Sequence, residues 1–262
     1  MADRVRVRRE RPTALSRALA LAVTMLAVYL ATLGAPEKEV DAEPALGGAR
    51  VTREVTLQGV QMYFADLGVH ADPLQARIAA ADLASRGAAG VVRADASGHH
   101  VLGAAYELEA DARRIAQRLT EQENLSAAVL SLSAGEVSLR ITAPEGDIEA
   151  IVAADAVLRA QLNQAASMAL QVDRGELPAA SARTLAAVSA SELKSTKERL
   201  QKVSGAEEHP VSAGLIAQLD ALAQNLSETA RSGDRAAALS GRLRSCHVSG
   251  MLNLIEWLDS LQ

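Results

Sequence analysis

Aromatic residues are scarce in this chain, since Phe, Trp and Tyr together make up only 2% of its 262 residues. Aromatic side chains supply much of the burial in ordinary cores and interfaces. Apolar residues nevertheless make up 49% of the chain, and alanine supplies much of that share. The composition therefore predicts thin helical layers built from alanine, leucine and valine.

The chain also has very little cysteine and only a small net charge. Cys246 is the only cysteine, so no internal disulfide can form. We expect it to be a small buried helix residue, and the alternative is a reactive or intermolecular thiol. The net charge of −5 is mild, and no basic stripe runs through the expected folded region. This charge pattern argues against nucleic acid as a partner.

The sequence also lacks the motifs that carry catalysis. It has no Gly-rich phosphate loop, no nucleophile elbow and no Cys/His pair at catalytic spacing. His99 and His100 are neighbours on an expected strand, so their side chains point to opposite faces and cannot chelate one ion. We therefore expect a protein that is not an enzyme, with no catalytic residues, no metal site and no cofactor.

The one long apolar run lies near the N-terminus. Residues 1–17 are rich in arginine, and residues 18–36 carry no charge. About nineteen residues at 1.5 Å each span the ~30 Å hydrocarbon core of a membrane. The basic side stays in the cytoplasm, which predicts a cytoplasmic tail (1–17), a single-pass helix in the cell membrane (18–36) and extracytoplasmic domains. The alternative is a cleaved signal peptide, for which Leu33 fits poorly at the −3 position.

After an acidic linker, residues 37–53, a short sequence motif occurs twice; we refer to the two copies as the doubled phrase. The first copy is Leu67-Gly68-Val69-His70, and the second is Leu102-Gly103-Ala104-Ala105-Tyr106. Each copy is followed by an acidic turn, a helical stretch with small apolar residues and a short strand. Two such units in tandem predict a split βαβ sheet, βαββαβ, over residues 54–142, with two helices on one face.

Two segments beside the repeat leave alternatives open. The stretch around Gly59 is either one bent strand or two strands. Residues 137–141 alternate apolar and polar side chains, so they are expected to form one further strand. That strand either extends the sheet at an edge or leads out of it.

The rest of the chain, residues 145–262, is expected to be helical. Short breaks between long helices imply antiparallel neighbours, which predicts a bundle of three or four helices and an α+β fold class overall. One helix carries a coiled-coil-like seam of four leucines. We favour an intramolecular core for this seam over a homodimer contact; its residues are Leu215, Leu219, Leu222 and Leu226.

Strand alternation assigns the two faces of the expected sheet. If Ala65, Leu67 and Val101 face the helices, their neighbours point the other way. A sheet covered on one side leaves its other side free to bind a ligand. The expected ligand-binding residues of this outer sheet face are Phe64, Asp66, Gly68, Val91, Arg93, His100 and Leu102.

The doubled phrase resembles the sporulation-related repeat (SPOR) domain of bacterial envelope proteins. Repeats of that family read valine-glutamine-leucine-glycine-small-phenylalanine and valine-x-valine-glycine-x-phenylalanine. The corresponding segments here are residues 65–70 and 101–106, and the likeness covers roughly residues 57–132. This chain departs from the pattern at Asp66, where the family commonly has glutamine, and at His70, where it has phenylalanine.

The resemblance implies that the outer sheet face binds peptidoglycan, especially glycan strands stripped of stem peptides, at division or sporulation sites. The expected anchor, linker and extracytoplasmic repeat are also arranged as in that family. We therefore expect a membrane-anchored peptidoglycan-binding envelope protein. The alternative is an anchored scaffold whose SPOR-like domain has lost glycan binding and whose helical bundle contacts envelope or division proteins.

Overall fold

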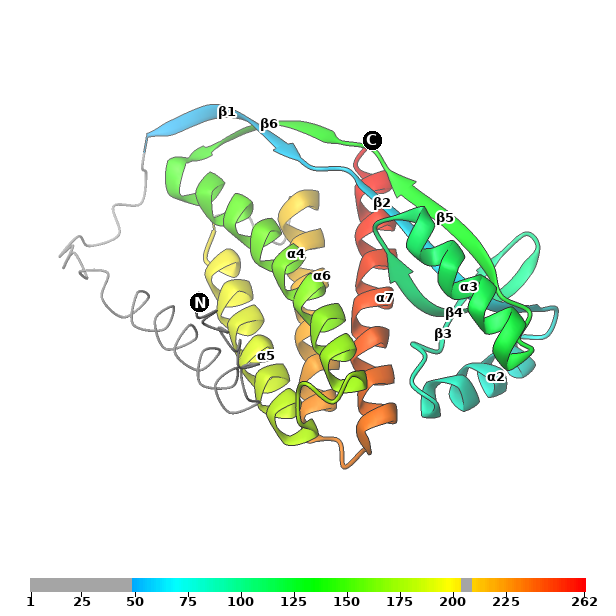
Figure 1. Cartoon of the computed structure of the whole chain (residues 1–262). Coiled ribbons are helices and arrows are strands. Elements are labelled where there is room, and N and C mark those ends of the chain that lie inside the picture. Colours follow the sequence, from blue (N-terminus) through cyan, green and yellow to red (C-terminus); the bar gives the residue numbers. More distant parts are fainter. Residues whose placement is uncertain (1–48, 204–208) are drawn as a thin grey trace, which may run out of the picture. The chain divides into compact units, whose positions relative to one another are not determined.

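The computed structural model describes residues 49–203 and 209–262, which belong to one compact unit (Figure 1). The predicted tail and transmembrane helix, residues 1–36, lie outside the described residues, as does most of the predicted linker. Within the described ranges, no helix is long and apolar enough to cross a membrane.

The doubled phrase forms a four-stranded antiparallel sheet, which confirms the predicted split βαβ arrangement. The strand order is β3-β4-β2-β5. Strand β4 therefore lies between the two strands of the first βαβ unit, and β2 lies between the two strands of the second. The elements are β2 (Val60–His70), α2 (Pro73–Ser85), β3 (Val91–Asp95), β4 (Gly98–Tyr106), α3 (Glu109–Glu123) and β5 (Ala128–Ala134).

Local sequence signals place α2 between its strands. The Asp72 carboxylate accepts a hydrogen bond from the Leu74 backbone N–H at 2.7 Å, and Pro73 occupies the first turn. The helix ends at Ser85, and Gly87 follows its C-cap with a φ of 103°, in the region that favours glycine. Both helices then pack on the same sheet face through small side chains, in a core that joins Ala76, Ala80 and Leu83 to Ala65, Leu67 and Val101.

Two bulges interrupt the pairing of β2 with β4. The register shifts between Ala65 and Asp66 and again between Asp66 and Val69. At the second shift Gly68 has φ 144°, which fits the extra residue of a bulge. The Asp66 carboxylate holds this bulge by accepting a hydrogen bond from the Gly68 N–H at 3.1 Å.

A two-stranded ribbon continues from the sheet over the helical bundle (Figure 1). It pairs β1 (Arg50–Leu57) with β6 (Val137–Pro144) antiparallel, apart from the four-stranded sheet. The structure therefore has two strands around Gly59, and the predicted strand at 137–141 leads out of the sheet. Arg159 of the first bundle helix donates to the Gln58 carbonyl at the bend, over 2.7 Å.

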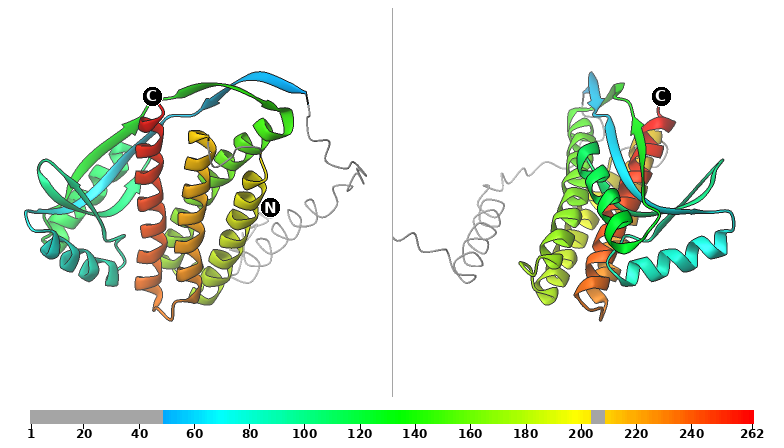
Figure 2. Two further views of the ribbon diagram at one scale, coloured as in Figure 1. Left: turned by 180° about the vertical axis from the view of Figure 1, so that it is seen from behind. Right: turned by 45° about the vertical axis from the view of Figure 1, so that its right-hand side comes forward.

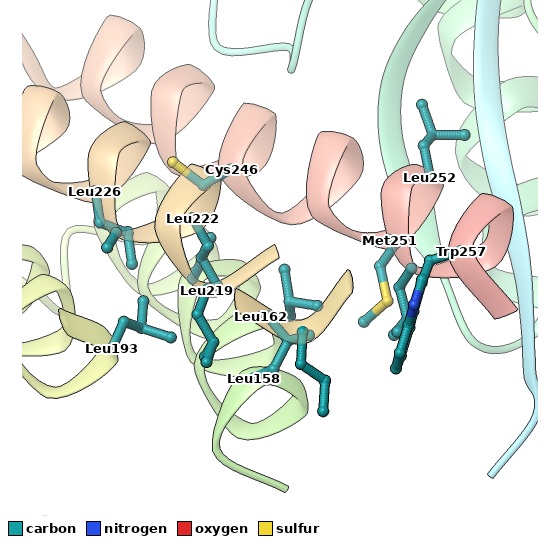
Figure 3. Close-up of a cluster of buried hydrophobic side chains, with 14 of the residues drawn as sticks. Leu158, Leu162, Leu193, Leu219, Leu222, Leu226, Cys246, Met251, Leu252 and Trp257 are labelled. Carbon is teal, nitrogen blue, oxygen red and sulfur yellow. The ribbon is translucent and has the colours of Figure 1, made fainter. Parts of the chain in front are cut away.

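Residues after β6 form a bundle of four helices, within the prediction of three or four. The helices are α4 (Glu145–Asp173), α5 (Ala179–Gln201), α6 (Pro210–Arg231) and α7 (Ala236–Ser260). Figure 3 shows leucines of α4, α5 and α6 in one buried cluster with Cys246, Met251 and Trp257 of α7. All four seam leucines are buried, which confirms the intramolecular interpretation.

Cys246 lies buried among these helices, as predicted. Its Sγ is 3.7 Å from the Thr229 hydroxyl. Burial raises the pKa of this thiol to about 11, so the reactive thiolate form is disfavoured near neutral pH.

Helix α7 lies between the bundle and the sheet. It contacts all four strands of the sheet as well as α4 and α6. In Figure 3, Leu252 projects from α7 on the side opposite Met251 and Trp257. One continuous core therefore crosses the junction at residue 145 that separates the expected SPOR-like domain from the expected bundle.

Candidate functional site

The outer sheet face is not open, which corrects the expectation that this side of the sheet is free. Phe64 and Leu102, at its centre, are both 0% exposed and belong to the same core as the bundle helices. Strand alternation had assigned these two side chains to the correct face. The error lay in leaving that face uncovered, because α7 packs on it (Figure 2).

The contact between α7 and the sheet domain is close. A Cβ added to Gly241 of α7 would lie 2.6 Å from the Ala84 carbonyl oxygen and 2.8 Å from that of Ala88. Three residues along the helix, the Arg244 guanidinium hydrogen-bonds the Gly87 carbonyl and pairs with Asp173 of α4. Arg244 thus joins the end of α2 to the end of α4.

The other predicted residues lie toward one end of the same face. Val91 and Gly68 are half-buried, and Val91 packs against the shared core. Arg93 is half-buried and pairs with Asp95, with 3.3 Å between its Nη1 and the carboxylate. Asp66 and His100 are buried, at 5% and 7% exposure. None of these side chains has the exposure expected of an open glycan platform.

Asp66 and His100 instead form a polar cluster with Asp95 and Ser97. His100 Nδ1 lies 2.7 Å from Asp66 Oδ2, and His100 Nε2 lies 3.0 Å from Asp95 Oδ2. The Ser97 hydroxyl lies 2.9 Å from the same Nε2 and donates to Asp95 Oδ1 over 2.6 Å. The β3–β4 hairpin supplies three of the four residues, and Asp66 comes from the bulged part of β2.

A serine, a histidine and an aspartate in hydrogen-bond contact have the composition of a hydrolase triad. The second carboxylate changes the chemistry of this one. Burial disfavours charge on the ring, but hydrogen bonds to Asp66 and Asp95 outweigh it, so the pKa of His100 is raised above its ordinary value. When the His100 ring is protonated, both of its nitrogens donate, and it cannot then take a proton from Ser97. These contacts link the β3–β4 hairpin to the bulged part of β2.

Asp95 is the member of this cluster that sequence reasoning missed, together with Ser97. Hydrogen bonds from the Ser97 side chain and backbone, and then from His100, hold the pKa of Asp95 well below its usual range. The available signal was the hairpin turn Asp95-Ala96-Ser97-Gly98, where aspartate and serine commonly bond their own backbone. The Ser97 N–H does so here, at 2.8 Å from Asp95 Oδ1.

The cluster predicts a pH dependence of stability. Because the folded-state pKa of His100 is raised, its stabilisation is complete below its ordinary value of 6.5 and is lost as pH rises through the folded pKa. We therefore expect the unfolding free energy to fall as the pH rises above 6.5. Urea denaturation of the full chain across this range measures the slope.

His100→Gln, which keeps a donor but cannot become charged, should remove most of that slope. His247 provides the control, because burial lowers its pKa and its effect on stability lies on the acid side. His247→Asn should therefore leave the slope above pH 6.5 in place. An unchanged slope in His100→Gln would contradict the charged state assigned to this ring.

The structure thus gathers Asp66, His100 and Arg93 at one end of the sheet, and it places Phe64 and Leu102 in the core. Within the residues described, no three His, Cys, Asp or Glu side chains are placed to hold a metal ion. Comparisons of the chain with protein-family models, with curated proteins and with solved structures give no match.

Proposed function

We propose that this chain is a membrane-anchored scaffold of the bacterial envelope, in which the SPOR-like sheet has become a structural element. The observation that carries the proposal is the complete burial of Phe64 and Leu102 beneath α7. A glycan strand could reach that face only after α7 left it. Such a movement would expose the aliphatic core that the sheet shares with four helices.

The cluster around His100 supports the same proposal. Glycan-binding faces need donors and acceptors that are free to meet sugar hydroxyls. Here Asp66 is engaged by Gly68 and His100, and Asp95 is engaged by Ser97, His100 and Arg93. These polar groups stabilise the hairpin and the β2 bulge, so the departure from the family's glutamine at Asp66 has a structural purpose.

Sedimentation with peptidoglycan tests the loss of glycan binding. The full chain, in a mild non-ionic detergent, is mixed with intact sacculi and with sacculi treated with an amidase that removes stem peptides. We expect the same background retention on both. Specific enrichment on amidase-treated sacculi would overturn the proposal and favour the wall-binding alternative.

Crosslinking in living cells tests the scaffold itself. A photo-crosslinking residue replaces Val188, which is 59% exposed on α5, or Val152, which is 48% exposed on α4. We expect at least one position to give a protein adduct of reproducible mass that persists after the wall is digested. Adducts from neither position, or adducts that disappear with the wall, would count against a scaffold.

A further inference from the structure

A cleft opens on the opposite side of the sheet, between the end of α2 and α3. Its volume is about 690 Å³, and the bulged part of the sheet forms its floor. The ends of α2 and α4, the outer half of α3 and one residue of α7 form its walls. The floor and lower walls are apolar and include Ala65, Leu67, Leu83, Ala104, Ile115 and Leu119.

Four arginines and two acids line the upper part of this cleft. Two of the arginines are already neutralised, since Arg86 pairs with Glu123 at 3.1 Å and Arg244 pairs with Asp173. Arg118 of α3 and Arg174 at the end of α4 have no ion-pair partner in the part of the chain that the structure describes. The cleft therefore carries two uncompensated positive charges above an apolar floor.

Tyr106 adds a hydrogen-bond donor to the lining of the cleft. The first β-bulge turns its ring to the helix side of the sheet, where it packs with the α2 and α3 core and lines the cleft. Burial raises the pKa of the Tyr106 hydroxyl, while the charges of Arg244 and Arg118 act in the opposite direction. The hydroxyl therefore stays protonated at neutral pH and can donate a hydrogen bond.

Arg118, Arg174, Tyr106 and the apolar floor together indicate which kind of ligand fits the cleft. A guanidinium and a phenol both donate to carboxylate oxygens, and arginine does so with a planar, bidentate fork. The apolar part of the cleft offers alanine, glycine, leucine and isoleucine, which suits small apolar side chains. A cleft of this volume has room for a ligand of several residues.

We infer that this cleft binds the free carboxylate end of a short peptide with small apolar side chains. The carboxylate lies against Arg118 and Tyr106, with Arg174 adding charge, and the side chains lie on the floor formed by Leu67 and Ala104. The inference is independent of the proposed scaffold function, because it concerns the opposite face of the sheet.

Isothermal titration of the full chain in lipid nanodiscs tests the inference with N-acetyl-dialanine as the probe. Its C-terminal amide has the same shape without the charge and is the control ligand. We expect the acid to bind at least about tenfold more tightly than the amide. Inorganic phosphate should compete only weakly, because it cannot use the apolar floor.

Variants on α3 give a matched pair for the same titration. Arg118→Gln should weaken binding of the acid about tenfold and leave the amide unchanged. Arg114→Gln, four residues earlier, removes an arginine that pairs with Asp111 outside the cleft and should have no effect. Tyr106→Phe should weaken acid binding about threefold by removing one hydrogen bond.

Three results would overturn the inference. The acid and the amide could bind equally, Arg114→Gln could weaken binding as much as Arg118→Gln, or phosphate could displace the acid at equal concentration. The last result would indicate a bare-anion site without a role for the floor. Circular dichroism of each variant identifies a loss that comes from unfolding.

Discussion

Replacing Phe64 with alanine is expected to lower the free energy of unfolding by about 3–5 kcal/mol, the cost typical of removing a buried phenylalanine ring. Phe64 is fully buried at the centre of the contact between the sheet and the bundle. Its loss leaves a cavity in the core that the sheet shares with the bundle. Urea denaturation of the full chain in non-ionic detergent measures the change.

Leu74→Ala is the matched control for Phe64→Ala. It also removes a large apolar side chain from the sheet domain, but Leu74 is 62% exposed on α2. Its effect should stay within about 0.5 kcal/mol. If Phe64 were exposed for glycan binding, Phe64→Ala would also have a small effect on stability. Equal and small effects of the two variants would therefore contradict the burial of Phe64 beneath α7.

Gly241→Ala is the second change with a large expected effect. An alanine Cβ would lie 2.6 Å and 2.8 Å from two backbone carbonyl oxygens at the end of α2, and backbone cannot move aside as a flexible side chain can. We expect a loss of about 1–3 kcal/mol, the usual cost of overpacking. The gain of up to about 1 kcal/mol that alanine brings to a helix interior works against this loss.

Gly146→Ala separates these two effects. Gly146 lies in the first turn of α4 with no heavy atom near the position of an added Cβ, so only the helix preference remains and stability should stay the same or rise. Hydrogen exchange gives a second readout, since Gly241→Ala should speed exchange in residues 83–90 and Gly146→Ala should not. Equal stabilisation by both substitutions would show that α7 does not approach α2 so closely.

Much of the fold could be predicted from the sequence, because its signals are local. The doubled phrase predicted both βαβ units, and the breaks between leucine-rich segments predicted the bundle. Alternation correctly placed Leu67 and Val101 toward the helices, and Phe64 and Leu102 away from them.

The two bulges mark the limit of that reasoning. Alternation past Gly103 sends Ala104 to the outer face, whereas the structure pairs Ala104 with Ala65 and places it in the cleft. A one-residue bulge reverses the side of every residue beyond it. Nothing in the repeat pattern alone specifies where such an extra residue falls.

The cover on the outer sheet face could have been anticipated from α7. Its buried side chains lie on several sides of the helix, with Val248 and Leu252 as well as Met251 and Leu258 among them. A helix that is apolar all round is buried between two layers. The single phenylalanine of an aromatic-poor chain pointed the same way, since such a ring is more useful in a core than on a surface.

The ribbon of β1 and β6 also determines how the folded unit responds to tension. Arg50, where the chain enters the fold, pairs with Pro144, directly before α4 begins, so both ends lie at the same end of the ladder. A force applied between the N-terminal segment and α4 acts on the β1–β6 residue pairs one after another, beginning with Arg50 and Pro144. The contact between Arg53 and Glu145, 2.8 Å long, lies near that end and would be among the first to break. Opening of the ribbon would begin at Arg50 and Pro144 and would stop toward Leu57 and Val137, whose buried side chains belong to the core that the sheet shares with the bundle.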